Sequence, residues 1–133
     1  MVYTTYLSKM KDLPGDAYKV IISRYLPSTF HVNKKNREYH VPDLAPSHSL
    51  LKEYKDGVCS WDDFVQAYNR EMESSPFTTQ AIQALVQTIK EHRDDDIFLI
   101  CYEKDANKCH RSLLASFLKE NYEINCVEWN GEK

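Results

Sequence analysis

Two short, uninterrupted apolar runs constrain the fold of this chain more than any other feature of its sequence. Val20, Ile21 and Ile22 form the centre of the first run, and residues 97–102 form the second. A strand that is apolar on both faces needs cover on both sides of its sheet, as in parallel or mixed sheets packed against helices. The two runs therefore predict buried strands over residues 18–23 and 97–102.

Further strands are predicted at the two ends of the chain. Residues 2–7 are rich in β-branched and aromatic side chains, and residues 124–129 have a similar character. The sequence around Pro14 and Gly15 indicates a turn-rich loop over residues 8–16. Residues 25–45 show no sustained periodicity, so we expect a long loop there.

Four helices are predicted between these strands. Ser47 is expected to cap a short helix that ends near Gly57, and Ser60, followed by Asp63, is expected to cap a longer one. A third helix is expected to begin at Thr78 or Thr79. The fourth carries an apolar stripe made of Leu113, Leu114, Phe117 and Leu118.

Alternating strands and helices predict an α/β fold with a small mixed or parallel sheet covered by helices in a single layered domain. The chain has 133 residues, which is enough for one domain of ordinary size, and no linker divides it. We therefore expect one domain over residues 1–133. A chain of this length needs neither a disulfide nor a structural metal to fold.

The overall charge and the apolar runs exclude several classes of partner. The formal net charge is -3, which makes general binding to duplex DNA unlikely. No apolar run approaches the about 20 residues needed to cross a bilayer, and the N-terminus does not resemble a signal peptide. The four cysteines are widely spread and form no C-x-x-C pair. We therefore expect a cytoplasmic protein with reduced thiols.

Residues 101–111 are the candidate site, because they join a buried strand to the following helix, where α/β proteins bind ligands. If Asn107 caps that helix, then Lys108, Cys109 and His110 occupy its first turn. The free N–H groups of that turn, with Lys108 and Arg111, favour an anion. The same field favours the thiolate of Cys109.

These residues also have other interpretations. A buried cysteine such as Cys101 is often a packing residue, and Arg111 could form a surface ion pair with Glu103. The spacing of Cys101, Cys109 and Arg111 does not match a phosphatase loop with five residues between Cys and Arg. A zinc site normally has four ligands, and we expect the adjacent residues Cys109 and His110 not to face one ion. We therefore predict no metal and no cofactor.

The strand, loop and helix motif resembles the signature of the domain of unknown function 488 family. The motif consists of Cys101-Tyr102-Glu103-Lys104 followed by Cys109-His110-Arg111 at the head of a Leu-rich helix. Similar matches occur at residues 3–6, 11–14, 22–24 and 44–47. Many relatives have Asp-Val-Arg after the second strand, where this chain has Ile22-Ser23-Arg24.

The resemblance implies that one further arginine joins the site. It implies that Arg24 and the two motif segments meet at one end of the sheet, so that Arg24, Cys101, Glu103, Cys109, His110 and Arg111 converge. It implies no general activity, because none is established for the family.

Two hypotheses of function follow. The first is an enzyme that acts on a nucleotide, a nucleic-acid component or another phosphorylated substrate held by Arg24, Arg111 and Lys108. In it Cys109 is the nucleophile or His110 the general base, Glu103 orients either one, and Cys101 completes the catalytic set. The second is a non-catalytic ligand-binding or regulatory module that uses the same pocket.

Overall fold

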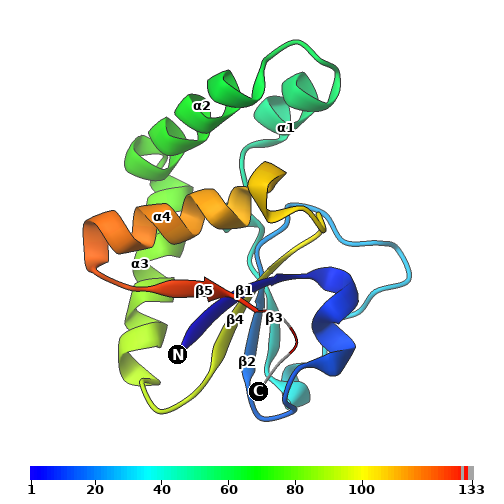
Figure 1. The fold of residues 1–133 in the computed structure, drawn as a ribbon, viewed down its shortest axis with the longest axis vertical. Helices are drawn as coiled ribbons and strands as arrows, with labels where there is room; N and C mark the ends of the chain where they lie inside the picture. Colours follow the sequence, from blue (N-terminus) through cyan, green and yellow to red (C-terminus); the bar gives the residue numbers. More distant parts are fainter. Residues whose placement is uncertain (130, 132–133) are drawn as a thin grey trace.

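The computed structural model describes residues 1–129 and 131 and has a five-stranded sheet at its centre (Figure 1). The strands are β1 (Val2–Tyr6), β2 (Tyr18–Ile21), β3 (Glu38–His40), β4 (Ile97–Cys101) and β5 (Cys126–Glu128). Their order across the sheet is β3-β2-β4-β1-β5, and all four pairings are parallel. The predicted α/β fold is confirmed, with a parallel sheet.

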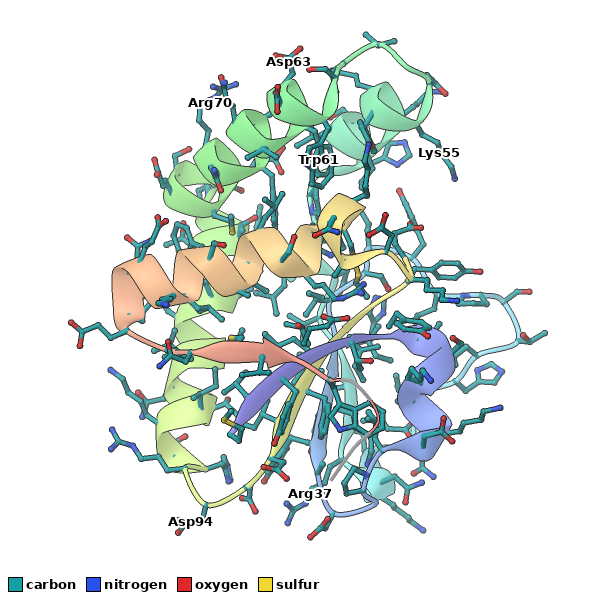
Figure 2. All side chains as sticks on the ribbon, in the orientation of Figure 1. Arg37, Lys55, Trp61, Asp63, Arg70 and Asp94 are labelled. Atoms are coloured by element: carbon teal, nitrogen blue, oxygen red, sulfur yellow. A yellow bond between two sulfur atoms is a disulfide. The ribbon has the colours of Figure 1, made fainter. Side chains whose placement is uncertain are left out.

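The described residues form four α-helices, α1 (His48–Lys55), α2 (Trp61–Ser74), α3 (Pro76–Glu91) and α4 (His110–Tyr122). Helices α3 and α4 cover one face of the sheet, whereas α2 packs on both of them and α1 on α2, beyond the ends of the strands (Figure 1, Figure 2). Their buried side chains form one cluster with strand residues such as Val20 and Leu99. No helix in the described part of the chain is long and apolar enough to cross a membrane.

The opposite face of the sheet is covered by a 3-10 helix and by loops. Met10 of η1 (Leu7–Asp12) packs there against Ile21, Phe98 and Ile100. Phe30, Val32 and Trp129 pack at its margin. Strands β2 and β4 are apolar on both sides because both faces of the sheet are covered. The α-helices cover only one face, and η1 and the loops cover the other.

The predicted helix starts are confirmed in two cases and corrected in two. The side chain of Ser47 accepts a hydrogen bond from the Leu50 N–H, and that of Ser60 from the Asp63 N–H. Helix α3 begins at Pro76, earlier than predicted, because the first turn of a helix tolerates proline.

Asn107 does not cap α4, so that prediction was wrong. Asn107 lies inside a 3-10 turn, η4 (Ala106–Lys108), and its backbone N–H donates to the side chain of Asp105. The N-cap of α4 is Cys109, which has extended backbone angles. The helix therefore starts later than expected, and the thiol of Cys109 lies at its N-terminal boundary.

The expected loop over residues 25–45 contains a strand that sequence periodicity missed. Strand β3 pairs with β2 at the edge of the sheet, and two further 3-10 turns, η2 (Lys34–Asn36) and η3 (Pro42–Leu44), flank it. Lys19 on β2 helps to hold this edge, because its buried ammonium donates to the carbonyls of Gly15, Ala17 and Asn36. Burial lowers the pKa of Lys19.

The order of the strands creates a topological switch point between β2 and β4. The chain leaves β2 toward β3 on one side and leaves β4 toward β5 on the other. The two strands are neighbours, and the Ile22 N–H donates to the Ile100 carbonyl at 2.7 Å. Ligands of open parallel sheets bind at the carboxyl ends of strands at such a point. Residues 22–24 and the β4–α4 loop both lie there.

Candidate functional site

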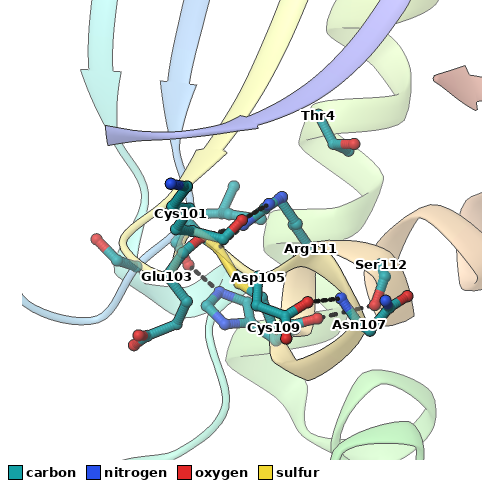
Figure 3. Close-up of a disulfide and its surroundings, with 12 residues drawn as sticks. Thr4, Cys101, Glu103, Asp105, Asn107, Cys109, Arg111 and Ser112 are labelled. Atoms are coloured by element: carbon teal, nitrogen blue, oxygen red, sulfur yellow. Dashed lines mark hydrogen bonds between the residues drawn. A yellow bond between two sulfur atoms is a disulfide. The ribbon is translucent and has the colours of Figure 1, made fainter. Parts of the chain in front are cut away.

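Cys101 and Cys109 form a disulfide at this point of the fold (Figure 3). Cys101 is the last residue of β4 and Cys109 is the N-cap of α4, so the bond closes the loop between them. Both side chains are buried. The expectation of reduced thiols was wrong for this pair, because the loop folds back and brings two residues eight positions apart together. Cys59 and Cys126 are free.

His110 follows the disulfide directly and is buried. Its Nε2 lies 2.8 Å from the carbonyl oxygen of Ile22, and its ring is nearly perpendicular to that of Tyr68, with the ring centroids 5.8 Å apart. Because a carbonyl only accepts, Nε2 is the protonated nitrogen. The pKa of His110 is lowered to about 4, mainly by burial and also by the positive charges of Arg111 and Arg24, while the hydrogen bond to Ile22 acts in the opposite direction. The imidazole is therefore neutral at physiological pH.

Arg111 is fully buried, and its guanidinium group ties the β4–α4 loop to β5. It donates to the backbone carbonyls of Glu103 and Lys104 and to the sulfur of Cys101. Its Nε and Nη2 donate to the two carboxylate oxygens of Glu128 at 3.0 and 2.8 Å. These five hydrogen bonds use all five N–H groups of the Arg111 guanidinium. Its direct contact with a substrate stays a prediction.

The ion pair that we considered for Arg111 has a different partner. Glu128 on β5 supplies the carboxylate, whereas Glu103 supplies only its backbone carbonyl. The side chain of Glu103 is exposed and forms no hydrogen bond with the described residues. It therefore does not contact Cys109 or His110 through a hydrogen bond in this structure, and its predicted orienting role stays a prediction.

Arg24 and Lys108 lie on the two segments that flank the switch point. The Nε of Arg24 donates to the Pro46 carbonyl at 2.8 Å, and Nη2 donates to the Ala45 carbonyl at 3.4 Å. Its Nη1 forms no hydrogen bond with any described residue. Lys108 is exposed on η4, and its ammonium has no ion-pair partner within residues 1–129 and 131.

The structure thus brings together most of the predicted residues. A sulfur atom from each of Cys101 and Cys109 and a ring nitrogen of His110 lie within 4.8 Å of one another. The adjacency of Cys109 and His110 was expected to separate them, and this was wrong, because Cys109 is extended and His110 begins a helix. Arg111 contacts the sulfur of Cys101.

Sequence reasoning missed two participants. Glu128 comes from the last strand, far along the chain from the motif, and only its acidic character could have marked it. The Ile22 carbonyl is a backbone group, so the type of residue at this position could not have predicted its role. The side chain of Ile22 is part of the core, and its main-chain oxygen accepts the hydrogen bond of His110.

The two described cavities lie away from the cluster. The larger has a volume of about 610 Å³ and lies between η1 and the loop before β3, with Lys11, Phe30 and His31 in its wall. The smaller, of about 180 Å³, adjoins His92 and Asp95 at the other end of the sheet. Neither is lined by a predicted site residue.

Comparison with known proteins assigns the family. A family model named DUF488-N3a and described as the active DUF488-N3 subclade matches residues 2–122. The chain belongs to this DUF488 family. No curated protein and no solved structure gives a significant match. The DUF488-N3a match includes the whole strand, loop and helix that carry the cysteine pair, His110 and Arg111, so the resemblance noted in the motif is confirmed.

Proposed function

We propose that this DUF488 protein is an enzyme that acts on a small anionic substrate, such as a nucleotide or another phosphorylated compound. The observation that carries the proposal is the convergence of Cys101, Cys109 and His110 at the β2–β4 switch point, between two segments that bear Arg24 and Lys108. The description of the family model as active supports catalysis.

The substrate anion would be held by groups that the fold leaves available. Arg24 keeps its Nη1 free among the described residues, and Lys108 is exposed at the start of the helical segment. Charge-assisted hydrogen bonds from such groups are stronger than neutral ones. Arg111 serves as a positioning residue in this proposal, because it braces the loop through Glu103, Lys104 and Glu128.

The reacting groups would come from the cluster itself. His110 is neutral, so the nitrogen that does not donate to Ile22 has a lone pair to accept a proton. Cys109 lies at a helix N-terminus, which stabilises a thiolate once the disulfide is reduced. Reduction needs two electrons and two protons, which an external dithiol supplies as it becomes a disulfide.

The test is a thermal-shift titration with inorganic phosphate, pyrophosphate and adenine nucleotides, followed by turnover assays with any ligand that binds. Binding to the folded state raises Tm by mass action. Lys108→Ala and Arg24→Gln should each weaken anion binding about tenfold, the scale of one charged hydrogen bond. Lys119→Ala is the matched control, because Lys119 lies at the opposite end of α4. Equal affinity in all variants would contradict the proposal.

One observation favours a second candidate, a non-catalytic binding module. Cys101 and Cys109 are buried and bonded to each other, and the donors of Arg111 are filled by the protein itself. In a module, Cys109→Ser leaves ligand binding intact and no ligand is converted by the reduced wild-type protein. In the enzyme, reduced wild type converts the ligand and Cys109→Ser does not.

A further inference from the structure

The cluster of Cys101, Cys109 and His110 has the composition of a metal site. Its three potential ligand atoms lie within 4.8 Å of one another, and all three side chains are buried. Thiolate sulfur and imidazole nitrogen are the ligands that Zn²⁺ prefers, and two cysteines with one histidine form a known catalytic zinc set. We propose that the reduced cluster binds Zn²⁺ or a similar thiophilic divalent ion.

The hydrogen bond of His110 prepares its ring for a metal. Metal-binding histidines usually donate their second nitrogen to a carboxylate or a backbone carbonyl, which fixes the tautomer. His110 does this already, since Nε2 donates to the Ile22 carbonyl at 2.8 Å. Its Nδ1 then carries the lone pair, and it makes no hydrogen bond with the described residues. This nitrogen belongs to a side chain that is only 8% exposed.

The surroundings of Cys101 suit a thiolate ligand. The Nη1 of Arg111 donates to the Cys101 sulfur at 3.2 Å, which is the kind of outer contact that orients and stabilises a ligating thiolate. The positive charge of that guanidinium is balanced by Glu128. A divalent ion and two thiolates would therefore add no net charge to the buried site.

The spacing of the backbone also suits an ion between the sulfurs. The Cα atoms of Cys101 and Cys109 are 7.5 Å apart, whereas disulfides usually join Cα atoms about 4.4 to 6.8 Å apart. Two zinc–sulfur bonds of about 2.3 Å each span a wider gap than one bond between sulfurs. The backbone thus has room for an ion at this place.

The two cysteines cannot form the disulfide and bind the metal ion at the same time. Conversion of the disulfide form to the metal-bound form takes two steps. A dithiol reductant gives two electrons and two protons to the bond and becomes a disulfide. The two thiols then lose two protons as they bind the ion. Three protein ligands leave a fourth position of a tetrahedral ion for water or an anion. Metal binding does not depend on the proposed enzyme, but a role in turnover does.

The experiment is a Co²⁺ titration of the protein with all 133 residues, reduced with a phosphine that is then removed without oxygen. We expect one equivalent of Co²⁺ to produce the sulfur-to-cobalt charge-transfer bands and the intense visible bands of a tetrahedral site, and Zn²⁺ to abolish them. A thiol count in denaturant confirms reduction. Failure of the folded protein to be reduced, or the absence of these bands in reduced protein, would overturn the metal site.

Variants locate the ion and separate this proposal from the previous one. Cys101→Ser and Cys109→Ser should each lose the spectrum, and His110→Gln, which can still donate to Ile22, should weaken Co²⁺ binding at least tenfold. The double variant Cys59→Ser and Cys126→Ser should keep it, because these free cysteines lie outside the cluster. Bands that survive in both Cys101→Ser and Cys109→Ser would contradict the site. The anion titration uses the disulfide form, so either proposal can fail alone.

Discussion

Two neighbouring threonines of β1 have different surroundings at the scale of single residues. The hydroxyl of Thr4 donates to Glu128 at 2.7 Å, and so extends the Arg111–Glu128 pair. The hydroxyl of Thr5 is buried without a hydrogen-bond partner among the described residues. A buried polar group without a partner costs stability, whereas a partnered one does not.

Replacing each threonine by valine should therefore have opposite effects. Thr5→Val should raise the free energy of unfolding by about 1 kcal/mol, because it removes the unsatisfied hydroxyl. Thr4→Val should lower it by about 1 kcal/mol, because Glu128 loses a donor. Urea unfolding of the two variants beside the wild type measures both values. Destabilisation by Thr5→Val would show that its hydroxyl has a partner after all.

His110 makes stability depend on pH. Its folded pKa of about 4 lies below the ordinary value of 6.5, so the unfolded chain binds the proton more readily. The free energy of unfolding is therefore highest above pH 6.5 and falls as the pH drops from 6.5 toward 4, because the unfolded chain gains a proton at His110 that the folded protein does not. Between pH 6.5 and about 5 the loss should reach about 2 kcal/mol. Burial is the main cause, and the charges of Arg24 and Arg111 add to it.

The measurement is urea unfolding of the disulfide form at a series of pH values, with a chelator present. His110→Gln should flatten the decline in this range, since glutamine does not titrate. His31→Gln is the control, because His31 is exposed. If the free energy of unfolding falls equally steeply with decreasing pH in His110→Gln and in the wild type, the idea of a buried neutral imidazole is contradicted.

At the scale of elements, Arg111 joins three parts of the fold. It lies in the first turn of α4, contacts the loop after β4 and pairs with β5. Arg111→Met should lower the free energy of unfolding by about 3 kcal/mol, because it leaves two carbonyls and a carboxylate without their donor. Glu128→Gln should cost less, because the Glu128 side chain is 40% exposed.

Denaturant unfolding of both variants and of Arg111→Lys gives the comparison. We expect Arg111→Lys to recover less than half of the loss, since one ammonium cannot reach all the acceptors of the planar guanidinium. Near-complete recovery by lysine would show that charge alone matters at this position.

The same elements show what the sequence could and could not predict. The two apolar runs gave β2 and β4, and Ser47 and Ser60 marked helix starts, because burial and capping depend on neighbouring residues. Strand β3 escaped detection, since a three-residue edge strand, Glu38–His40, has too little length for a period. The N-cap of α4 was misplaced because Asn107 is a common capping residue and cysteine is not.

For the site, the local motif predicted the meeting of Cys101, Cys109, His110 and Arg111, because one loop and one helix turn carry all four. The pairing of Arg111 with Glu128 could not be predicted, since it depends on β5 lying next to β1 rather than next to β4. The disulfide was also missed, because thiol spacing alone does not say how the loop folds back.

At the scale of the whole molecule, the disulfide closes a short loop in the middle of the site. Cross-linking residues eight positions apart restricts the unfolded chain, and the chain-entropy model gives about 2.5 kcal/mol for such a loop. Reduction should lower the free energy of unfolding by that amount. Urea unfolding with and without a phosphine reductant checks it in the Cys59→Ser and Cys126→Ser background. An unchanged midpoint would mean that the reduced loop is held equally well by other contacts.

The order of the strands has a consequence for synthesis on the ribosome. Of the five strands β1 is synthesised first, yet its two neighbours in the sheet are β4 and β5, which are synthesised last of the five. Until residues 97–101 have left the exit tunnel, β1 has no partner on either edge, and unpaired edges are templates for wrong association. The nascent chain can pair β2 with β3 and form α1, α2 and α3 before then, but the sheet is complete only when β4 and β5 have emerged.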